Sequence, residues 1–239
     1  MPPPPGPNDF VTVLTGAGVS AESGIRTFRD AGGLWESHRF EDVASPRAFA
    51  RDPALVWRFY KMRWANASSA RPNPAHEALA ALEEALPGRF CLVTQNVDGL
   101  HQLAGSKHVR EMHGSLRRCR CTACGQMHAI TSIDLSPTVP LCPTCDGRLR
   151  PDIVWFGEMP HYMPEIDAAL RRAGVLLVAG TSGVVYPAAQ FVALARGYGA
   201  RTVGVNLEPP ANRGLFHHFL QGRAGEVLPL LAQAWSKGA

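Results

Sequence analysis

The sequence predicts an α/β protein with a doubly wound parallel sheet. Four short apolar runs, at residues 11–15, 90–94, 175–179 and 202–206, are typical of buried parallel strands. Helical patterns lie between these runs, and strands that alternate with helices form βαβ units. We therefore expect one open sheet that is covered by helices on both faces.

The clearest helical pattern begins after Asn73, which is a predicted N-cap. Pro74 takes the first helical position and Gly88 follows the helix end, as the two ends of a helix prefer. The stretches 164–174 and 187–199 repeat this order, with proline at the start and glycine at the end. We expect helices in both.

Composition and charge narrow the class of protein. With 46% apolar and 18% charged residues, the 239-residue chain resembles a soluble globular enzyme with one core and a smaller appendage. The net charge of +4 is mild and contains no basic run of the kind found in nucleic-acid-binding arms. No apolar run is long enough to cross a membrane. The Pro-rich residues 1–9 are expected to be disordered and lack the pattern of a signal peptide, which indicates a cytoplasmic protein.

Two insertions interrupt the strand–helix alternation and set the predicted domain boundaries. Residues 34–72 form a helical insertion with many aromatic side chains, and residues 114–151 hold five of the six cysteines. The main domain, Rossmann-like in its alternation, then comprises residues 10–33, 73–113 and 152–239.

The strand ends carry the functional signal. The four predicted strands run into "TGAG", "TQNVD", "AGTSG" and "NLE", which are all polar or rich in glycine. In an open parallel sheet, ligands bind in the crevice beyond the carboxyl ends of the strands. We expect these four exits to line one crevice.

A glycine-rich turn follows the first strand. Gly16, Gly18 and Ala21 fit the G-x-G-x-x-G/A pattern, in which backbone N–H groups approach a pyrophosphate at a helix N-terminus. Alone, this pattern also fits a tight turn that binds no ligand. The acidic residue that a dehydrogenase shows about 20 residues later, after a second strand, is absent here. A bound dinucleotide is therefore expected to serve a reaction other than hydride transfer.

The cysteines predict a metal site. Cys121-x₂-Cys124 and Cys142-x₂-Cys145 have the spacing of a four-cysteine zinc ribbon. Four thiolates leave no open position on the metal, so the zinc would be structural. Cys119 breaks the two-residue spacing and is interpreted as a bystander.

Polar residues after the second strand are candidates for catalysis. Gln95, Asn96 and Asp98 lie at its mouth, where an amide and a carboxylate can hold a ribose or a carboxamide. His113 ends a short predicted strand that exits toward the same crevice, and imidazole is the usual group for moving protons at neutral pH. Most of the nine histidines, His217 and His218 among them, are expected to be surface or packing residues.

Taken together, "GAGVSAESGIRTFRD", "TQNVDGLH", "HGS", the paired CxxC motifs, "GTSGVVYPAA" and "VNLE" resemble the sirtuins, which are NAD-dependent protein-lysine deacylases. The resemblance runs in order from about residue 11 to residue 230. Arg26 departs from it, because many members have proline there. The resemblance implies NAD lying along the strand ends, bound by Gly16, Ala17, Gly18, Ala21, Phe28, Arg29, Gln95, Asn96, Asp98, Gly180, Thr181, Ser182, Asn206, Glu208 and Ala224.

The implied reaction consumes NAD as a co-substrate. Nicotinamide leaves, the acyl oxygen of a modified lysine attacks the exposed ribose carbon, and the 2′ oxygen of the ribose then attacks the acyl carbon. Water completes the reaction, and the products are free lysine and 2′-O-acyl-ADP-ribose. His113 would act as general base, and Asn96 and Asp98 would hold the nicotinamide ribose and carboxamide. The segment that contains Val154, Phe156 and Gly157 resembles the one that pairs with the substrate peptide by strand addition.

Tyr60 and Arg63 suggest which acyl group is removed. Family members that prefer succinyl- or malonyl-lysine carry Tyr-x-x-Arg in the helical insertion and a small residue in the acyl tunnel, which Ala31 matches here. Residues three apart share a helix face, and arginine can bind a carboxylate with two N–H groups while a phenol donates a third bond. The alternative is that Tyr60 belongs to an apolar stripe and Arg63 only covers its edge.

Two other functions remain open. The same fold could transfer ADP-ribose to a protein side chain, or a zinc-ribbon protein could bind nucleic acid through "RRCRC". The second is disfavoured because that stretch lacks aromatic residues interleaved with its cations. We expect a monomer whose partners are acyl-lysine-bearing proteins.

Overall fold

A computed structural model describes residues 1–26, 34–35 and 38–237. Its main sheet has six parallel strands in the order β11-β10-β9-β1-β4-β5. The four predicted strands are confirmed, and two shorter strands extend the sheet at its edges. The bounds are β1 Phe10–Thr15, β4 Phe90–Thr94, β5 Val109–Glu111, β9 Ala173–Ala179, β10 Arg201–Asn206 and β11 His218–Gln221.

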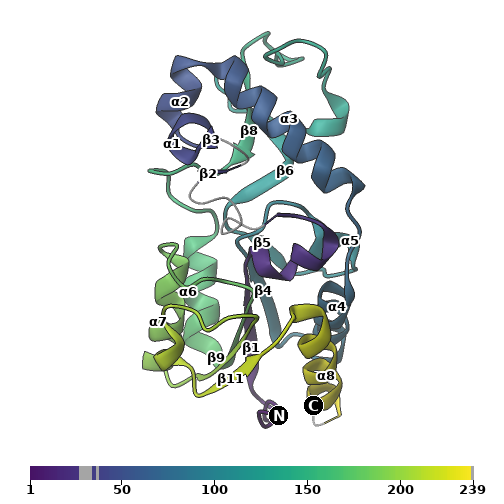
Figure 1. Cartoon of the computed structure of the whole chain (residues 1–239), viewed down its shortest axis with the longest axis vertical. Helices are drawn as coiled ribbons and strands as arrows, with labels where there is room; N and C mark the ends of the chain where they lie inside the picture. The colour runs from purple at the N-terminus through teal and green to yellow at the C-terminus, as the bar shows by residue number, and fades with distance from the viewer. Residues whose placement is uncertain (27–33, 36–37, 238–239) are drawn as a thin grey trace.

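Helices cover both faces of this sheet, as predicted (Figure 1). One core cluster packs alternate strand residues such as Val13 and Leu177 against α4 and α8, and the other packs Leu14 and Leu176 against α6 and α7. This alternation follows from the two-residue period of a strand. The helices are α4 Pro74–Ala85, α6 Met163–Arg172, α7 Phe191–Gly197 and α8 Ala224–Ser236.

Asn73 is the N-cap of α4, as the sequence predicts. Its side-chain oxygen accepts a hydrogen bond from the backbone N–H of Ala75 at 2.9 Å. The ring of His76 completes the cap, because its Nδ1 accepts the backbone N–H of Asn73 at 3.2 Å. This reciprocal arrangement satisfies donors that a helix start leaves free, and it fixes the orientation of the His76 ring.

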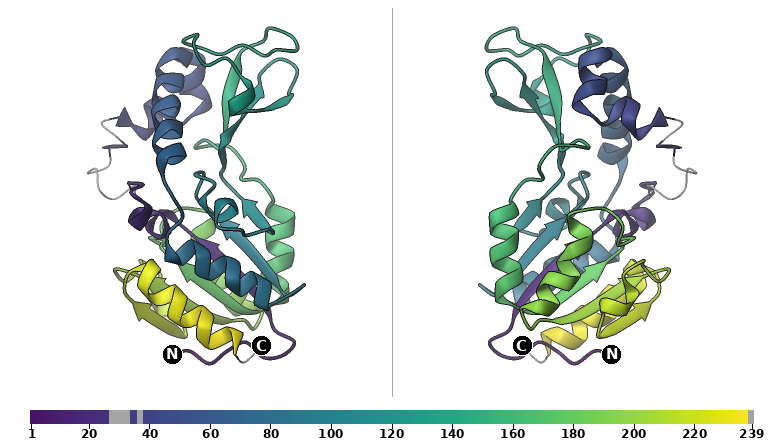
Figure 2. Two further views of the ribbon diagram at one scale, coloured as in Figure 1. Left: turned by 90° about the vertical axis from the view of Figure 1, so that its right-hand side faces the viewer. Right: turned by 90° about the vertical axis from the view of Figure 1, so that its left-hand side faces the viewer.

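The two insertions lie together beyond the carboxyl ends of the main strands (Figures 1 and 2). The long helix α3 packs on the small domain, where the Trp57 indole donates to the carbonyl of Leu149 at 2.7 Å. The first insertion contains β2 Leu34–Trp35, β3 His38–Arg39, α1 Phe40–Val43, α2 Pro46–Arg51 and α3 Pro53–Ser69. The small domain is the antiparallel sheet of β6 Gly114–Cys121, β7 Met127–Ala129 and β8 Leu149–Ile153.

The four predicted cysteine ligands meet at one end of the small domain. Their sulfur atoms all lie within 4.8 Å of one another, with Cys121–Cys145 at 3.5 Å and Cys124–Cys142 at 3.8 Å. Tetrahedral zinc with Zn–S bonds of about 2.3 Å places sulfurs about 3.8 Å apart, so these residues fit a structural zinc ion. Cys119 lies outside this group, and its thiol contacts the carbonyl of His128 at 3.7 Å.

The Pro-rich lead differs from the disordered segment expected from its composition. The Arg201 guanidinium donates to the carbonyls of Pro3 and Pro4, both at 2.9 Å. The Trp235 indole donates to the carbonyl of Pro2 at 3.4 Å. Prolines cannot donate backbone hydrogen bonds, but their carbonyls can accept them, and these contacts hold the segment against β10 and α8.

In the described parts of the chain, no helix has both the length and the apolar character that a membrane span requires.

Zinc binding by the cysteine cluster can be tested with Cys142→Ser. We expect less than one zinc ion per chain and an unfolding temperature lowered by about 5 °C or more, because metal binding supplies folding free energy to this small sheet. Metal analysis and thermal unfolding measure both effects. Cys119→Ala is the matched control, since Cys119 is equally buried but lies outside the cluster. Zinc loss in both variants would contradict the assignment.

Candidate active site

A cleft of about 1180 Å³ separates the strand ends from the two insertions. It lies where the winding of the sheet reverses, because the chain moves from β1 toward β4 on one side and continues with β9 and β10 on the other. Such switch points are the usual ligand sites of doubly wound sheets. From the predicted NAD-binding set, the lining includes Gly16, Ala17, Gly18, Ala21, Gln95, Asn96, Asp98, Gly180, Thr181, Ser182, Asn206, Glu208 and Ala224.

Three of the predicted residues lie outside the described parts of the chain. They are Phe28, Arg29 and Ala31.

The glycine turn is shaped by close backbone contact. A Cβ on Gly16 would lie 2.7 Å from the Gly180 carbonyl, and one on Gly18 would lie 2.8 Å from the Gly180 Cα. The helix expected directly after this turn takes the form of two three-residue 3₁₀ helices, Ala17–Val19 and Ala21–Ser23. The Gly18 N–H is already bonded to the Gly180 carbonyl at 2.8 Å.

Two side-chain amides brace the facing turn after β9. The Asn206 amide donates to the Thr181 carbonyl at 2.9 Å, and the Gln95 amide donates to the Thr181 hydroxyl at 3.1 Å. Gly180 has φ of 64°, a conformation that favours glycine. These contacts hold the turns after β1 and β9 together, with a strip of polar groups facing the cleft.

Asn96 and Asp98 meet at a serine that sequence reasoning missed. The Asn96 amide donates to the Gly16 carbonyl and to the Ser20 hydroxyl, both at 3.1 Å. Ser20 in turn donates to an Asp98 carboxylate oxygen at 2.8 Å. All three side chains are buried, so each polar atom needs a partner within the protein. The glycine-rich motif contains Ser20, but spacing alone gave it no role.

His76 completes this network from helix α4. Its Nδ1 accepts a backbone N–H at the helix cap, so in the neutral ring the hydrogen lies on Nε2, which is 3.3 Å from the Ser20 hydroxyl. Burial lowers the pKa of His76, while the Asp98 carboxylate acts in the opposite direction. The result is a directed chain from His76 through Ser20 to Asp98. The sequence could have revealed His76 only as the third residue of a capped helix.

His113 lies in the turn between β5 and β6 and lines the same cleft. Its Nδ1 is 3.2 Å from the Gln95 carbonyl, which can only accept, so Nδ1 carries the hydrogen and Nε2 is the basic nitrogen. Burial lowers the pKa of His113, the hydrogen bond to Gln95 raises it, and His161 lowers it further. A neutral ring with one free basic nitrogen can accept a proton.

Tyr60 and Arg63 both line the wall of the cleft that α3 forms. The Tyr60 hydroxyl accepts the indole N–H of Trp155 at 3.0 Å, and burial raises the pKa of Tyr60 to about 12. The Arg63 guanidinium lies 5.7 Å from the centre of the Phe59 ring. Tyr60 therefore packs in the apolar cluster of the insertion and also lines the cleft. Its position is compatible both with a packing role and with contact to a ligand.

The predicted peptide-binding segment follows β8 along the cleft. Val154, Phe156 and Gly157 all line it, and the Phe156 side chain is 52% exposed. The backbone N–H of Val154 donates to the His113 carbonyl at 2.9 Å. The backbone N–H of Phe156 donates to the Ala44 carbonyl at 3.0 Å. The segment therefore joins the main domain to the helical insertion.

Known proteins share this fold and sequence. A chain from Pyrobaculum aerophilum described as NAD-dependent protein deacylase 2 is 53% identical over 224 residues, which are 92% of this chain and 89% of the relative. An NAD-dependent protein deacylase from Salmonella typhimurium is 50% identical over 235 residues, or 97% and 85% of the two chains. A solved complex of a Sir2 homologue with NAD has a TM-score of 0.88 and 43% identity, covering 95% of this chain and 89% of the other.

The family model described as "Sir2 family" matches residues 16–187. This span contains the glycine turn, the Asn96–Asp98 strip, His113 and all four clustered cysteines. The chain belongs to the Sir2 family.

Proposed function

We propose that this chain is an NAD-dependent protein-lysine deacylase that prefers acyl groups ending in a carboxylate, such as succinyl and malonyl. The observation that carries the proposal is that one cleft is lined by the glycine turn, by Asn96 and Asp98, by His113, and by Tyr60 with Arg63. The curated relatives described above are named NAD-dependent protein deacylases. A further solved relative, a complex of Sir2 with a p53 peptide and NAD⁺, is 33% identical with a TM-score of 0.83 and covers 94% of this chain.

The residues fit NAD along the strand ends. The backbones of Gly16 and Gly18 pack closely against Gly180 and form a glycine-rich turn that lines the cleft directly after β1, which is where dinucleotide-binding folds hold a pyrophosphate. When bound, NAD supplies a ribose carbon that becomes reactive as nicotinamide departs. The buried chain from His76 through Ser20 to Asp98 is preorganised and can hold polar groups of the dinucleotide without rearrangement.

His113 would act as general base. Its Nε2 is available to accept a proton from a ribose hydroxyl, while the Gln95 carbonyl holds the ring through Nδ1. The deprotonated oxygen can then bond to the acyl carbon, the bond between that carbon and the lysine nitrogen would break, and with the uptake of water the free lysine would leave while the acyl group stays on the sugar. Because this step serves any acyl group, His113 is expected to be needed for all substrates.

Tyr60 and Arg63 would bind the far end of the acyl chain. An arginine can grip a carboxylate with two parallel hydrogen bonds, and a tyrosine that stays protonated can donate a third. The raised pKa of Tyr60 keeps its hydroxyl a donor at neutral pH. A carboxylate entering this mostly apolar wall without such partners would lose its hydration uncompensated.

Val154, Phe156 and Gly157 would hold the peptide backbone around the modified lysine. Extended peptides add to an exposed strand or strand-like segment through main-chain hydrogen bonds. The N–H groups of Val154 and Phe156 are already bonded within the chain, so a peptide would pair with other backbone groups of this stretch. None of the six cysteines forms a disulfide, which supports a reducing compartment such as the cytoplasm.

Arg63→Met tests the acyl preference. We expect activity on succinyl-lysine peptides to fall by about 100-fold or more, because a buried charged pair is worth roughly 2–5 kcal/mol. Weak deacetylation should persist. Steady-state kcat/KM on matched succinyl and acetyl peptides measures the difference. Arg58→Met, on an exposed position of the same helix, is the control. An equal loss on both peptides would refute the role of Arg63 in selectivity.

His113→Ala tests the general base. We expect turnover of every acyl peptide to fall by about 10²–10⁴-fold while NAD still binds, since the ring moves a proton but does not build the glycine turn. Single-turnover kinetics and calorimetric titration with NAD separate the two effects. His218→Ala on the edge strand β11 should keep normal turnover. Full activity in His113→Ala would remove this histidine from the reaction.

The pH profile gives an independent test of His113. Burial lowers its pKa, so the neutral, basic form persists below the ordinary histidine value of about 6.5. The acidic limb of kcat/KM should therefore fall only at a pH below that value. A limb centred clearly above 6.5 would show that another group controls the rate.

Mass spectrometry separates deacylation from the rival transfer of ADP-ribose to protein. Acyl-ADP-ribose released into solution supports the proposal, and a stable ADP-ribosylated protein would support the rival.

Binding of nucleic acid through the basic stretch is disfavoured by Arg118, which already pairs with Glu111 and Asp152, both at 2.9 Å. Steeply salt-dependent DNA binding without NAD consumption would favour that function instead.

A further inference from the structure

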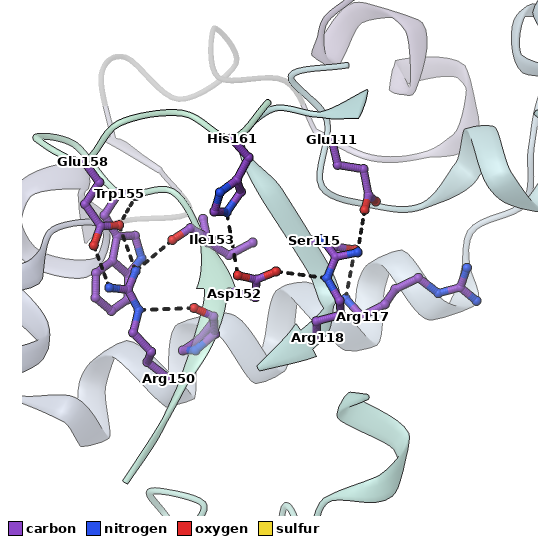
Figure 3. Close-up of polar contacts among 11 residues, drawn as sticks. Glu111, Ser115, Arg117, Arg118, Arg150, Asp152, Ile153, Trp155, Glu158 and His161 are labelled. Atoms are coloured by element: carbon purple, nitrogen blue, oxygen red, sulfur yellow. Dashed lines mark hydrogen bonds and ion pairs between the residues drawn. The ribbon is translucent and has the colours of Figure 1, made fainter. Parts of the chain in front are cut away.

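The indole of Trp155 lies on a buried arginine. The Arg150 guanidinium carbon is 3.4 Å from the centre of the Trp155 ring, a stacked cation–π contact. The same guanidinium donates two hydrogen bonds to the Glu158 carboxylate, at 2.6 and 2.9 Å, and one to the Ile153 carbonyl at 2.8 Å (Figure 3). Arg150 is only 7% exposed, so these partners are needed to offset its desolvation.

Glu158 ties this cation back to the chain segment that carries the indole. One of its carboxylate oxygens, besides binding Arg150, accepts the backbone N–H of Trp155 at 2.8 Å. The backbone and the ring of Trp155 are therefore both held by one ion pair (Figure 3). A planar guanidinium is suited to this position, because it can stack on a ring and bind a carboxylate in two places at once.

The held indole in turn acts on Tyr60. Its Nε1–H donates to the Tyr60 hydroxyl at 3.0 Å, and the two rings lie 6.4 Å apart. A hydroxyl has one hydrogen and can accept at its lone pairs. Since the indole occupies the accepting side, the Tyr60 hydrogen must point away from Trp155. Tyr60 itself is 2% exposed and lines the cleft, so its hydroxyl has few other directions to choose from.

We propose that Arg150 is a positioning residue for acyl selectivity, which sets the Trp155 indole so that the Tyr60 hydroxyl donates to a carboxylate at the end of the acyl chain. The inference rests on the proposed function, because it requires that Tyr60 meets such a carboxylate. Arg150 lies on β8 of the small domain. Trp155 and Glu158 line the cleft, but Arg150 is not among the described residues that line it. Its influence on the acyl group must therefore pass through the indole.

The test is Arg150→Lys, which keeps the positive charge and loses the planar stack and the two-point contact with Glu158. We expect kcat/KM on a succinyl-lysine peptide to fall on the order of ten-fold, mainly through KM, because one hydrogen bond to a charged group is misdirected. kcat/KM on the matched acetyl-lysine peptide should stay within about two-fold, since that acyl group has no carboxylate. Arg148→Lys, at an exposed position two residues before Arg150, should change neither value.

A double-mutant cycle with Tyr60→Phe shows whether Arg150 acts through the hydroxyl. In the Tyr60→Phe background, Arg150→Lys should cause no further loss of succinyl selectivity, because the group it orients is already gone. A merely structural role would lower both activities in both backgrounds. Zinc content and unfolding temperature of each variant check that the small domain remains folded.

Trp155→Phe provides a second route if Arg150→Lys does not fold. It keeps an aromatic ring for Arg150 to stack on and removes the N–H that Tyr60 accepts, together with part of the indole surface. The succinyl-to-acetyl ratio should fall by a similar factor and again show no further loss in Tyr60→Phe.

The outcomes separate two failures. If the unaltered chain shows no preference for the succinyl over the acetyl peptide, the proposed acyl preference itself is wrong. If it shows the preference but Tyr60→Phe leaves the succinyl-to-acetyl ratio unchanged, Tyr60 does not bind the carboxylate and the positioning role of Arg150 is overturned. If Tyr60→Phe lowers the ratio while Arg150→Lys and Trp155→Phe leave it unchanged, the acyl preference stands and the positioning role of Arg150 is overturned.

Discussion

The structure depends on close backbone contact at the switch point of the sheet. The turn after β1 meets the turn after β9 where Gly18 donates to the Gly180 carbonyl at 2.8 Å, and a side chain on Gly16 would collide with that carbonyl. Only glycine allows two strand exits to approach so closely. This contact fixes the floor of the cleft, and every polar group that faces it is placed relative to these two turns.

Behind this floor, the buried side chains of His76, Ser20 and Asp98 form a hydrogen-bonded chain. His76 is held by the cap of α4, Ser20 lies on a 3₁₀ turn, and Asp98 follows β4. A half-satisfied network would cost more than an apolar core, so each member constrains the others. The fold thereby offers preformed donors and acceptors to a dinucleotide, while His113 keeps one basic nitrogen facing the cleft.

The opposite wall is built by the two insertions, which are separated in the sequence by residues 73–113 of the main domain and yet pack as one unit. Tyr60 comes from the first insertion, and Trp155 follows the last strand of the second. Their hydrogen bond joins the two at the surface that would select the acyl group. Under the proposed function, acyl selectivity would depend on the contact between the insertions rather than on either insertion alone.

The sequence by itself determined the parallel sheet, the capped helix at Asn73, the zinc-ligand spacing and the strand exits that line the cleft. These features follow from local periodicity, from turn chemistry and from ligand spacing, which act over a few residues. Only the tertiary structure decided that 3₁₀ turns follow the glycine motif, that Ser20 and His76 join Asp98, and that Arg150 supports Trp155 and Tyr60. Those pairings link residues up to 95 positions apart, and no local pattern encodes which distant side chains will share one buried space.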